Sequence, residues 1–298
     1  MTHTPDSSVG SHSYEGYALD AENAAEMARL MVQDRVINQA MGGVLPEQTD
    51  LSQIYHVLDI ACGPGGWLLD VVTQYPHMHG VGIDISHLMI EYATSLAASQ
   101  RLSNVQFQEM DATKPLHFPD NTFDLVNGRI FVGFLSREQW PALIQECARI
   151  TKPGGLLRLT EAEWGFTNSP AFDKLSGLIG LALYRAGHSF SPHGRTIGTA
   201  NVLRSLLRQA GYQDIQYRAH ALDYSAGTEL HEGNVQDHLV FHKLIQPFFV
   251  QTQVATQEEL ESLYAQMEEE TQSEDFYAID YFLTVWGRKS ELVSPSRS

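Results

Sequence analysis

Cysteine, basic side chains and long apolar runs are all scarce in this chain of 298 residues. The two cysteines, Cys62 and Cys147, provide no disulfide framework, so we expect a reducing, cytoplasmic environment. No apolar run reaches the roughly 18 to 20 residues that a bilayer-spanning helix needs, and we therefore expect no membrane partner. Residues 1–13 are polar and lack the basic-then-apolar pattern of a secretion signal. They are expected to form a loose tail.

The shortage of basic side chains leaves a strong negative charge. The sequence holds 19 Lys and Arg against 36 Asp and Glu, for a formal net charge of −17. Such a field repels a phosphate polymer and no basic stripe offsets it, so nucleic acid is not an expected partner. Many of the acids lie in 258–275, with the spacing of the wet face of a helix. The length suits one large α/β core with an accessory layer.

The most informative segment that the chain does contain is 57–67, where an apolar strand runs into a glycine-rich turn. Asp59 stands near the end of that strand, and Gly63 and Gly65 let the backbone turn tightly and approach a ligand closely. A helix beginning at about Trp67 would point its first amide groups at the same ligand. The segment predicts a nucleotide-binding loop, although similar turns serve several nucleotide cofactors.

Two further strands are predicted to end in acids. Strand 80–86 carries Asp84 about 20 residues beyond the glycines, the spacing at which a carboxylate accepts hydrogen bonds from ribose hydroxyls. Strand 105–110 is followed by Asp111 and Ala112, where a side-chain acceptor could meet an adenine amine. The acids therefore predict one nucleoside site at a shared sheet edge.

Two more strands complete the first half. Strand 123–127 ends at Asn127, where a reacting centre would lie, and strand 156–161 follows a Lys-Pro-Gly-Gly turn. The order of strand, turn and helix is thus predicted five times over, which is typical of a parallel α/β sheet.

Taken in order, these segments resemble the class I S-adenosylmethionine-dependent methyltransferases, particularly the small-molecule group akin to the ubiquinone and menaquinone biosynthesis enzymes. The resemblance spans about residues 52–165 and is carried by Asp59-x-x-x-Gly63-x-Gly65-Gly66, Gly82-x-Asp84-x-Ser86, Asp111-Ala112, Phe123-Asp124-Leu125-Val126 and Lys152-Pro153-Gly154-Gly155. It implies a three-layer α/β fold, with a seven-stranded, mostly parallel, doubly wound sheet, an antiparallel last strand and helical lid inserts.

The same resemblance implies S-adenosylmethionine as the cofactor and S-adenosylhomocysteine as its product. The residues expected to hold the cofactor are Asp59, Gly63, Gly65, Asp84, Ile85, Asp111, Ala112 and Asn127. Tyr14 lies before the first helix, where some related enzymes fold an N-terminal segment over the cofactor, and a disordered tail is the alternative.

Other classes stay in view. A nicotinamide enzyme would place a third glycine in the turn, and that spacing is missing. Segment 127–130 lacks the Pro-Pro-aromatic run of DNA amino-methylating enzymes. A cofactor-binding relative without methylation, such as a cyclase or a regulatory module, remains an alternative, and a protein methyltransferase is a weaker one.

The remaining segments divide the chain into five parts. They are the N-terminal tail and cap helix (1–50), the cofactor-binding core (51–165), a lid insert (166–198), the core completion (199–289) with a helical lid insert at about 230–272, and a disordered tail (290–298). Strands 215–224 and 276–286 are expected to complete the sheet. Nothing in the sequence sets the oligomeric state, and a homodimer is left open.

The inserts should gather above the carboxyl edge of the sheet and enclose a small organic acceptor. They are rich in large apolar side chains, including Trp164, Phe166, Phe172, Leu178, Ile179, Leu183, Tyr184, Phe190, Phe241, Phe248 and Phe249. Most of these could instead pack the lid onto the core. The acceptor's identity, and whether oxygen, nitrogen or carbon is methylated, stay open.

Several side chains could handle a proton or hold the acceptor. Glu161 and Glu163 stand two apart at the end of a strand and share a face, the alternative being a structural role near Arg158. His188 and His193 bracket a turn and could act as near-neutral bases. The residues expected at the acceptor are Arg129, Trp164, Tyr184, Arg195, His238 and His242.

Three histidines, at 231, 238 and 242, share one face if 231–246 is helical. His238 and His242 have the spacing of a helical metal pair, but no glutamate follows His238 as it does in zinc hydrolases. Direct methyl transfer needs no metal, so none is expected.

Overall fold

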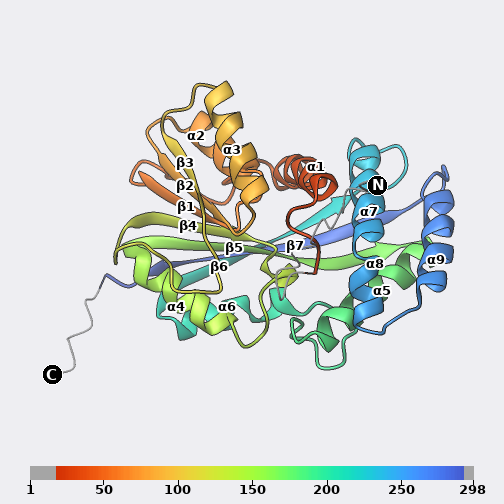
Figure 1. Cartoon of the computed structure of the whole chain (residues 1–298). Helices are drawn as coiled ribbons and strands as arrows, with labels where there is room; N and C mark the ends of the chain where they lie inside the picture. The colour runs from red at the N-terminus through yellow and green to blue at the C-terminus, as the bar shows by residue number, and fades with distance from the viewer. Residues whose placement is uncertain (1–17, 292–298) are drawn as a thin grey trace, which may run out of the picture.

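Seven strands form a single sheet in the computed structural model, which describes residues 18–291 (Figure 1). Their order is β3-β2-β1-β4-β5-β7-β6, and β7 is antiparallel to both of its neighbours. The strands are β1 (His56–Ile60), β2 (His79–Asp84), β3 (Val105–Glu109), β4 (Phe123–Arg129), β5 (Thr151–Thr167), β6 (Tyr212–Asp223) and β7 (Ala278–Lys289). The predicted mostly parallel sheet with an antiparallel last strand is confirmed.

Helices cover both faces of this sheet. The first group is α1 (Ala24–Met41), α2 (Gly66–Gln74), α3 (His87–Ser99), η1 (Phe131–Gly133), α4 (Trp140–Ile150) and α6 (Thr199–Gln209). Helices α2 and α3 lie over one face and α4 and α6 over the other (Figure 1). The second group fills the segments predicted as inserts: α5 (Pro170–Arg185), α7 (His231–Leu244), α8 (Gln246–Gln251) and α9 (Gln257–Glu270).

Strand β1 shows why the sequence chooses this architecture. Val57, Leu58 and Ile60 are all 0% exposed, as expected for a central parallel strand with helices on both sides. Leu58 and Ile60 pack in one cluster with Ile144 of α4, and Val57 packs in another with Trp67 of α2. Alternate side chains of β1 therefore pack against helices on opposite faces of the sheet.

The ends of the helices follow their local sequence. Asn23 caps α1, Ser86 caps α3 and Ser169 caps α5 through side-chain oxygens that accept backbone N–H groups. Gly42 ends α1 in the left-handed conformation, with φ of 85°. Pro170, directly after the Ser169 cap, occupies the first turn of α5, where its missing N–H costs no hydrogen bond.

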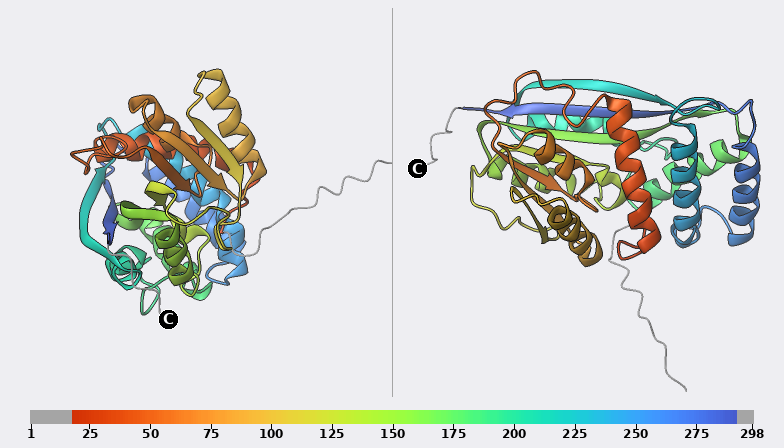
Figure 2. Two further views of the ribbon diagram at one scale, coloured as in Figure 1. Left: turned by 90° about the vertical axis from the view of Figure 1, so that its left-hand side faces the viewer. Right: turned by 90° about the horizontal axis from the view of Figure 1, so that it is seen from above.

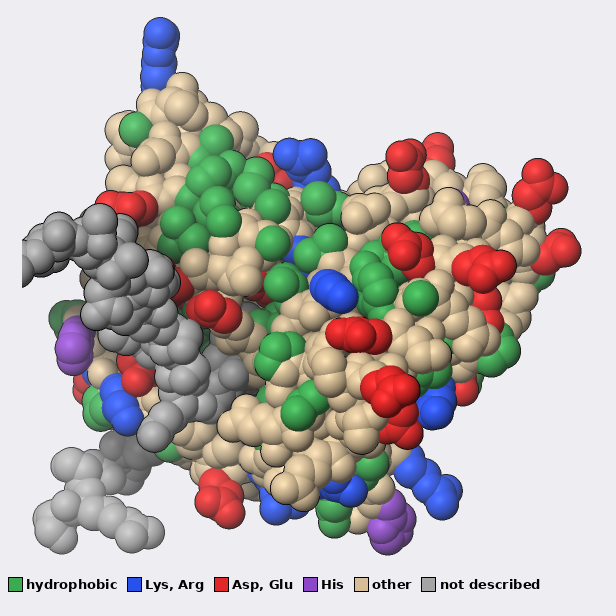
Figure 3. Space-filling model, turned by 45° about the vertical axis from the view of Figure 1, so that its right-hand side comes forward, with side chains coloured by type: hydrophobic (Ala, Val, Ile, Leu, Met, Phe, Trp, Pro, Cys, Tyr) green, Lys and Arg blue, Asp and Glu red, His purple; other side chains and the backbone are tan. Residues whose placement is uncertain are grey.

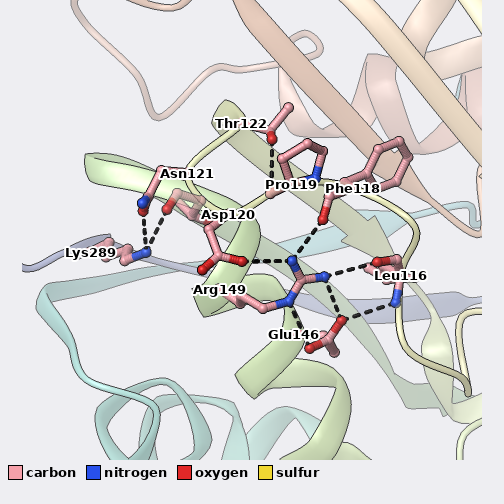
Figure 4. A network of polar contacts seen from close by, with 10 residues as sticks. Leu116, Phe118, Pro119, Asp120, Asn121, Thr122, Glu146, Arg149 and Lys289 are labelled. Atoms are coloured by element: carbon pink, nitrogen blue, oxygen red, sulfur yellow. Dashed lines mark hydrogen bonds and ion pairs between the residues drawn. The ribbon is translucent and has the colours of Figure 1, made fainter. Parts of the chain in front are cut away.

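The connection from β3 to β4 departs from the predicted strand-turn-helix order, because it contains no helix. Arg149 of α4 organises it instead (Figure 4). Its guanidinium donates to the carbonyl oxygens of Phe118 at 2.7 Å and Leu116 at 2.9 Å, and it pairs with Asp120 and Glu146. One side chain thus satisfies carbonyl groups that a helix would otherwise pair.

Strand β5 runs well beyond the predicted 156–161, and the insert helices pack beside its extension and the paired part of β7 (Figure 2). The ladder between the two strands is irregular between Glu163 and Phe166. Gly165 lies there, and a Cβ at this position would be 1.3 Å from the carbonyl oxygen of Ile279. The bulge therefore requires glycine, and it re-aims the neighbouring Trp164.

The acidic segment predicted as a wet helical face forms α9, which begins with a capping box at Thr256 and Glu259. Within residues 18–291, no helix combines the length and the apolar character needed to cross a bilayer. Cys62 and Cys147 are both free and buried.

Candidate functional site

A cavity of about 970 Å³ opens at the carboxyl ends of β1, β2 and β4 and extends beneath the insert helices. Its walls come from the glycine loop, α1, α5, α7 and the ends of β5 and β7. The space-filling view shows a hollow between two lobes, with apolar side chains along its border (Figure 3). Ligands of open α/β sheets bind at this edge.

The glycine loop is held in place by Asp84. The N–H of Gly63, which has a φ of 53°, donates to Asp84 Oδ2 at 2.8 Å, and the N–H of Ser86 donates to Oδ1 at 3.0 Å. Burial raises the pKa of Asp84, while these backbone hydrogen bonds act in the opposite direction. Gly63 and Asp84 both line the cavity.

Gly65 is needed for packing. Its φ is 82°, and a Cβ there would be 2.8 Å from the Phe107 ring and 2.9 Å from Ala93. It does not line the cavity, so the structure places it behind the loop and not against a ligand. Gly66 does line the cavity, and its missing Cβ leaves room for the Asp34 carboxylate of α1.

Asp59 ends a chain of buried polar contacts that crosses three strands. Asn127 Nδ2 donates to Asp59 Oδ1 at 2.7 Å, Arg158 Nη1 donates to Asn127 Oδ1 at 2.8 Å, and Arg158 pairs with Glu47 at 2.6 Å. Burial raises the pKa of Asp59 to about 7, against the opposing effects of Arg129 and Asn127. Asp59 lines the cavity, whereas Asn127 is 0% exposed and stands behind it.

Asp111, Ala112 and Ile85, three of the residues expected to hold the cofactor, line the cavity where β2 and β3 end. Thr113 donates to Asp111 Oδ1 through both its N–H, at 2.8 Å, and its hydroxyl, at 2.6 Å. These bonds fix the carboxylate and engage only one of its oxygens. Tyr14, the remaining predicted cofactor residue, lies outside the described residues.

The turn after β4 is strained. Ile130 lines the cavity and has a φ of 57°, a conformation that costs a β-branched residue about 1–2 kcal/mol. Glu161 holds the turn, because its Oε1 accepts the N–H of Phe131 at 2.7 Å. Burial raises the pKa of Glu161 to about 8, although hydrogen bonds from Phe131 and Val132 oppose the rise.

Glu161 is therefore corrected from catalytic candidate to support of this turn. It is 1% exposed and does not line the cavity. The contacts of Glu161 fit the structural role that the sequence left open as an alternative. Its partners are backbone groups after β4, however, and not Arg158.

Glu163 lines the cavity, but both of its oxygens are engaged. They accept the backbone N–H groups of Ile197 and Gly198, each at 2.7 Å, at the N-terminus of α6. A carboxylate at this position is stabilised by the helix dipole. These contacts suit Glu163 to anchoring α6.

His188 lines the cavity and is 5% exposed. Its Nδ1 lies 2.9 Å from the carbonyl oxygen of Val132, and since a carbonyl can only accept, Nδ1 carries the hydrogen. The neutral ring then has a lone pair on Nε2. Burial lowers the pKa of His188, which favours this neutral form.

His193 and Arg195 of the same turn, and Tyr184 of the preceding helix α5, do not reach the cavity, which corrects three expectations. His193 and Arg195 are exposed, Tyr184 is 40% exposed, and none of them lines the cavity. The Ser189 hydroxyl donates to the carbonyl oxygen of Ile197 at 2.8 Å and closes the turn. His188 precedes this closed turn and lines the cavity, His193 and Arg195 lie within the turn on its exposed side, and Tyr184 belongs to α5.

Arg129 lines the cavity, but its guanidinium is committed to α1. It forms an ion pair with Asp34 and donates to Asn38 Oδ1 at 3.2 Å. The predicted acceptor contact is therefore replaced by a contact that holds α1 over the glycine loop.

At the far end of the cavity, Trp164 and His238 line the wall and His242 does not. His238 Nε2 is 2.7 Å from Asp280 Oδ2. Burial lowers the pKa of His238, but the neighbouring Asp280 carboxylate outweighs burial and raises this pKa overall. Burial and the neighbouring His238 lower the pKa of His242 to about 3. Among residues 18–291, no three His, Cys, Asp or Glu side chains are grouped to bind a metal ion.

Four lining residues at this end were missed by the sequence reasoning: Arg29, Asn234, Asp237 and Asp280. Arg29 pairs with Glu26 at 2.7 Å and with Asp237 at 3.0 Å, joining α1 to α7. The i,i+3 spacing of Glu26 and Arg29 was a usable signal. Nothing in the sequence could indicate a partner more than 200 residues away.

Known proteins share the part of the chain that carries the first half of this site. Residues 57–155 match the model of a methyltransferase domain. A demethylmenaquinone methyltransferase of Symbiobacterium thermophilum is 29% identical over 198 residues, which cover 60% of this chain and 77% of that protein. Residues 57–155 therefore form a methyltransferase domain of the class I, S-adenosylmethionine-dependent type.

Other relatives of this methyltransferase are longer. Phosphoethanolamine N-methyltransferase 3 of Arabidopsis thaliana is 30% identical over 170 residues, which cover 57% of this chain but 31% of that protein. The structure of Haemonchus contortus phosphoethanolamine N-methyltransferase 2 shares the fold, with a TM-score of 0.56 and 16% identity, and covers 92% of this chain and 60% of that one. The matched domain ends before α5, so the insert helices of this methyltransferase lie outside it.

Proposed function

We propose that this methyltransferase moves the methyl group of S-adenosylmethionine to an oxygen, nitrogen or carbon atom of a small organic acceptor held inside the cavity. The observation that carries the proposal is that a single cavity runs from Asp84 and Asp111 to Trp164 and Phe241. Its volume of about 970 Å³ is near the top of the range for ligand pockets, roughly 300–1,000 Å³, which leaves room for donor and acceptor together.

The end of the cavity formed by Asp59, Gly63, Asp84 and Asp111, here called the donor end, fits the cofactor. Asp84 would accept the ribose hydroxyls, and Asp111, with one oxygen engaged by Thr113, would accept the adenine amine through the other. The glycine loop leaves space for the backbone to approach, and Asp59 would lie on the methionine side. The bound cofactor supplies a methyl group on a cationic sulfur.

Methyl transfer by direct displacement needs alignment, exclusion of water and, for an O–H or N–H acceptor, removal of a proton. We propose His188 for the proton, because its Nδ1–H is held by Val132 and a lone pair remains on Nε2. The strained turn at Ile130 supports alignment, since backbone strain concentrates where geometry matters to function.

Enclosure argues for a small acceptor. Helix α1 is tied across the cavity by Asp34 with Arg129 at one point and by Arg29 with Asp237 at another. A protein or nucleic-acid chain would have to displace these contacts, so we propose that α5 and α7, from the expected lid inserts, enclose the cavity together with the cap helix α1. The buried free thiols of Cys62 and Cys147 fit the proposed cytoplasmic location, and a homodimer stays a prediction.

Methyl-labelled S-adenosylmethionine tests this function. The protein is incubated with the label and a cell extract split into low-mass and macromolecular fractions. We expect S-adenosylhomocysteine to form and label to enter the low-mass fraction only. Label on macromolecules would instead indicate a protein methyltransferase, and cofactor binding without turnover in either fraction would indicate the non-methylating alternative; both would overturn the proposal.

A further inference from the structure

Three buried nitrogen atoms that have no hydrogen-bond partner within residues 18–291 lie at the far end of the cavity. They are Trp164 Nε1, Asn234 Nδ2 and His238 Nδ1. All three residues line the cavity, and Asn234 and His238 are 5% and 4% exposed. A buried polar group left unpaired costs about 1–3 kcal/mol, so a ligand that paired with all three would recover that cost on binding.

The three side chains belong to one small region. Asn234 and His238 are four residues apart on α7 and therefore neighbours on one face of the helix. The ring centroids of Trp164 and His238 are 5.9 Å apart. Asp280 engages Nε2 of His238 at 2.7 Å, and Tyr224 stacks on the ring at 5.3 Å. The imidazole is thus fixed, with Nδ1 as its remaining polar atom.

Hydrogen-bond chemistry limits what can bind here. The indole of Trp164 can only donate, and the amide nitrogen of Asn234 donates as well. His238 donates from Nδ1 when its ring is protonated, the form that Asp280 favours. The complementary ligand atom is an oxygen that accepts hydrogen bonds. An ammonium group has only N–H donors, so it could not form hydrogen bonds with these three donor groups.

Charge limits the ligand further. Three buried carboxylates, those of Glu26, Asp237 and Asp280, face two cationic groups, Arg29 and the protonated form of His238. The cluster therefore carries an excess of negative charge even in that form. Another carboxylate or a phosphate would add like charge in a buried setting, which is unfavourable.

We propose that Trp164, Asn234 and His238 form an anchor for a carbonyl or hydroxyl oxygen of the methyl acceptor. The anchor discriminates against acceptors with a carboxylate, a phosphate or an ammonium group at that position. This inference rests on the proposed function, because the anchored molecule is the acceptor. Asp280 and Tyr224 are positioning residues that set the orientation of the imidazole.

Indole N–H signals offer a direct test, since the chain has only four tryptophans. Protein labelled with ¹⁵N is titrated with four probes on one bicyclic frame: 1-indanone, indane, 1-aminoindane and indane-1-carboxylate. We expect 1-indanone to move the Trp164 indole proton downfield and the other three to leave it in place. Trp140 is the internal control, because its Nε1 is also buried and unpaired but does not line the cavity.

Variants make the assignment specific. Trp164→Phe should remove the responding signal, and Asn234→Leu should weaken 1-indanone binding about tenfold, the effect of one lost hydrogen bond. The control variant Asn201→Leu, at an exposed position of α6, should leave 1-indanone binding unchanged. A Trp164 signal that ignores 1-indanone, moves as much with indane, or responds to the charged probes would overturn the anchor.

S-adenosylhomocysteine binding, measured by calorimetry on the same samples, separates this proposal from the proposed function. Protein that binds S-adenosylhomocysteine but fails the indole test overturns the anchor alone. Protein that responds to 1-indanone but binds no S-adenosylhomocysteine overturns the proposed function instead.

Discussion

The side-chain amide of Asn127 donates to Asp59 at 2.7 Å while its carbonyl oxygen accepts from Arg158 at 2.8 Å. Asn127 is fully buried and stands one layer behind the cavity wall, so it orients the Asp59 carboxylate without facing a ligand. The carboxylate at the glycine loop is therefore set by a residue on the neighbouring strand.

Asn127→Ala should lower the free energy of unfolding by about 2–4 kcal/mol, because it removes the hydrogen-bond donor of buried Asp59 and one of the two acceptors of buried Arg158, which keeps only Glu47. Urea unfolding followed by circular dichroism measures the change. Asn201→Ala on the surface is the matched control and should fall within about 0.5 kcal/mol of the parent. An equally small effect at Asn127 would contradict the relay.

Raised carboxyl pKa values predict a stability that falls with rising pH. Glu161 has a folded-state pKa of about 8, so between roughly pH 4.5 and 8 the folded chain keeps a proton that the unfolded chain releases. The contribution of Glu161 to the free energy of unfolding is complete below the pKa of the unfolded chain. It declines by about 1.4 kcal/mol per pH unit until the pH reaches the pKa of the folded chain. Glu161→Gln should remove this part of the slope.

Unfolding of parent and Glu161→Gln proteins in urea at pH 5.5, 6.5 and 7.5 tests that slope. Asp59, with a pKa of about 7, keeps its own contribution in both proteins. Parallel stability curves for the two proteins would show that Glu161 is ionised in the fold and would refute the assignment.

Asp84→Asn should weaken S-adenosylhomocysteine binding about 10- to 100-fold, because one charged acceptor for the ribose is lost while the shape is kept. Calorimetry gives the affinity directly. Asp50→Asn, at an exposed position outside the cavity, should bind like the parent. Equal affinities for the two variants would argue against a ribose contact at Asp84.

Arg29→Met should destabilise the protein by about 3–5 kcal/mol, since it leaves the carboxylates of Glu26 and Asp237 buried without their cation. Adding Glu26→Gln and Asp237→Asn should restore most of that loss. Thermal unfolding of the single and triple variants compares the two, and a single variant as stable as the parent would show that the contact between α1 and α7 contributes nothing.

The donor end could be predicted because its pieces are local in sequence. Asp59, Asp84 and Asp111 each end a strand, and parallel strands bring their carboxyl ends to one edge. Gly65 shows the limit of this reasoning. A glycine can be required by a tight turn beside a ligand or by close packing, and the sequence looks the same in both cases. Only its position against Phe107 distinguishes them.

The far end of the cavity, where we place the methyl acceptor, could be predicted only in outline. The helix carrying His231, His238 and His242 was expected, but which of them faces the cavity depends on how α7 packs against β7. Glu161 and His193 failed as site residues for the same reason. Their neighbours in space, Phe131 and the closed turn around Ser189, come from tertiary contacts.

A crystal structure with S-adenosylhomocysteine bound tests the central claim most directly. We predict the ribose at Asp84, the adenine amine at Asp111 and the sulfur facing the part of the cavity lined by His188 and Trp164. S-adenosylhomocysteine bound elsewhere, or with its sulfur turned away from that part of the cavity, would contradict a methyl transfer inside this enclosure.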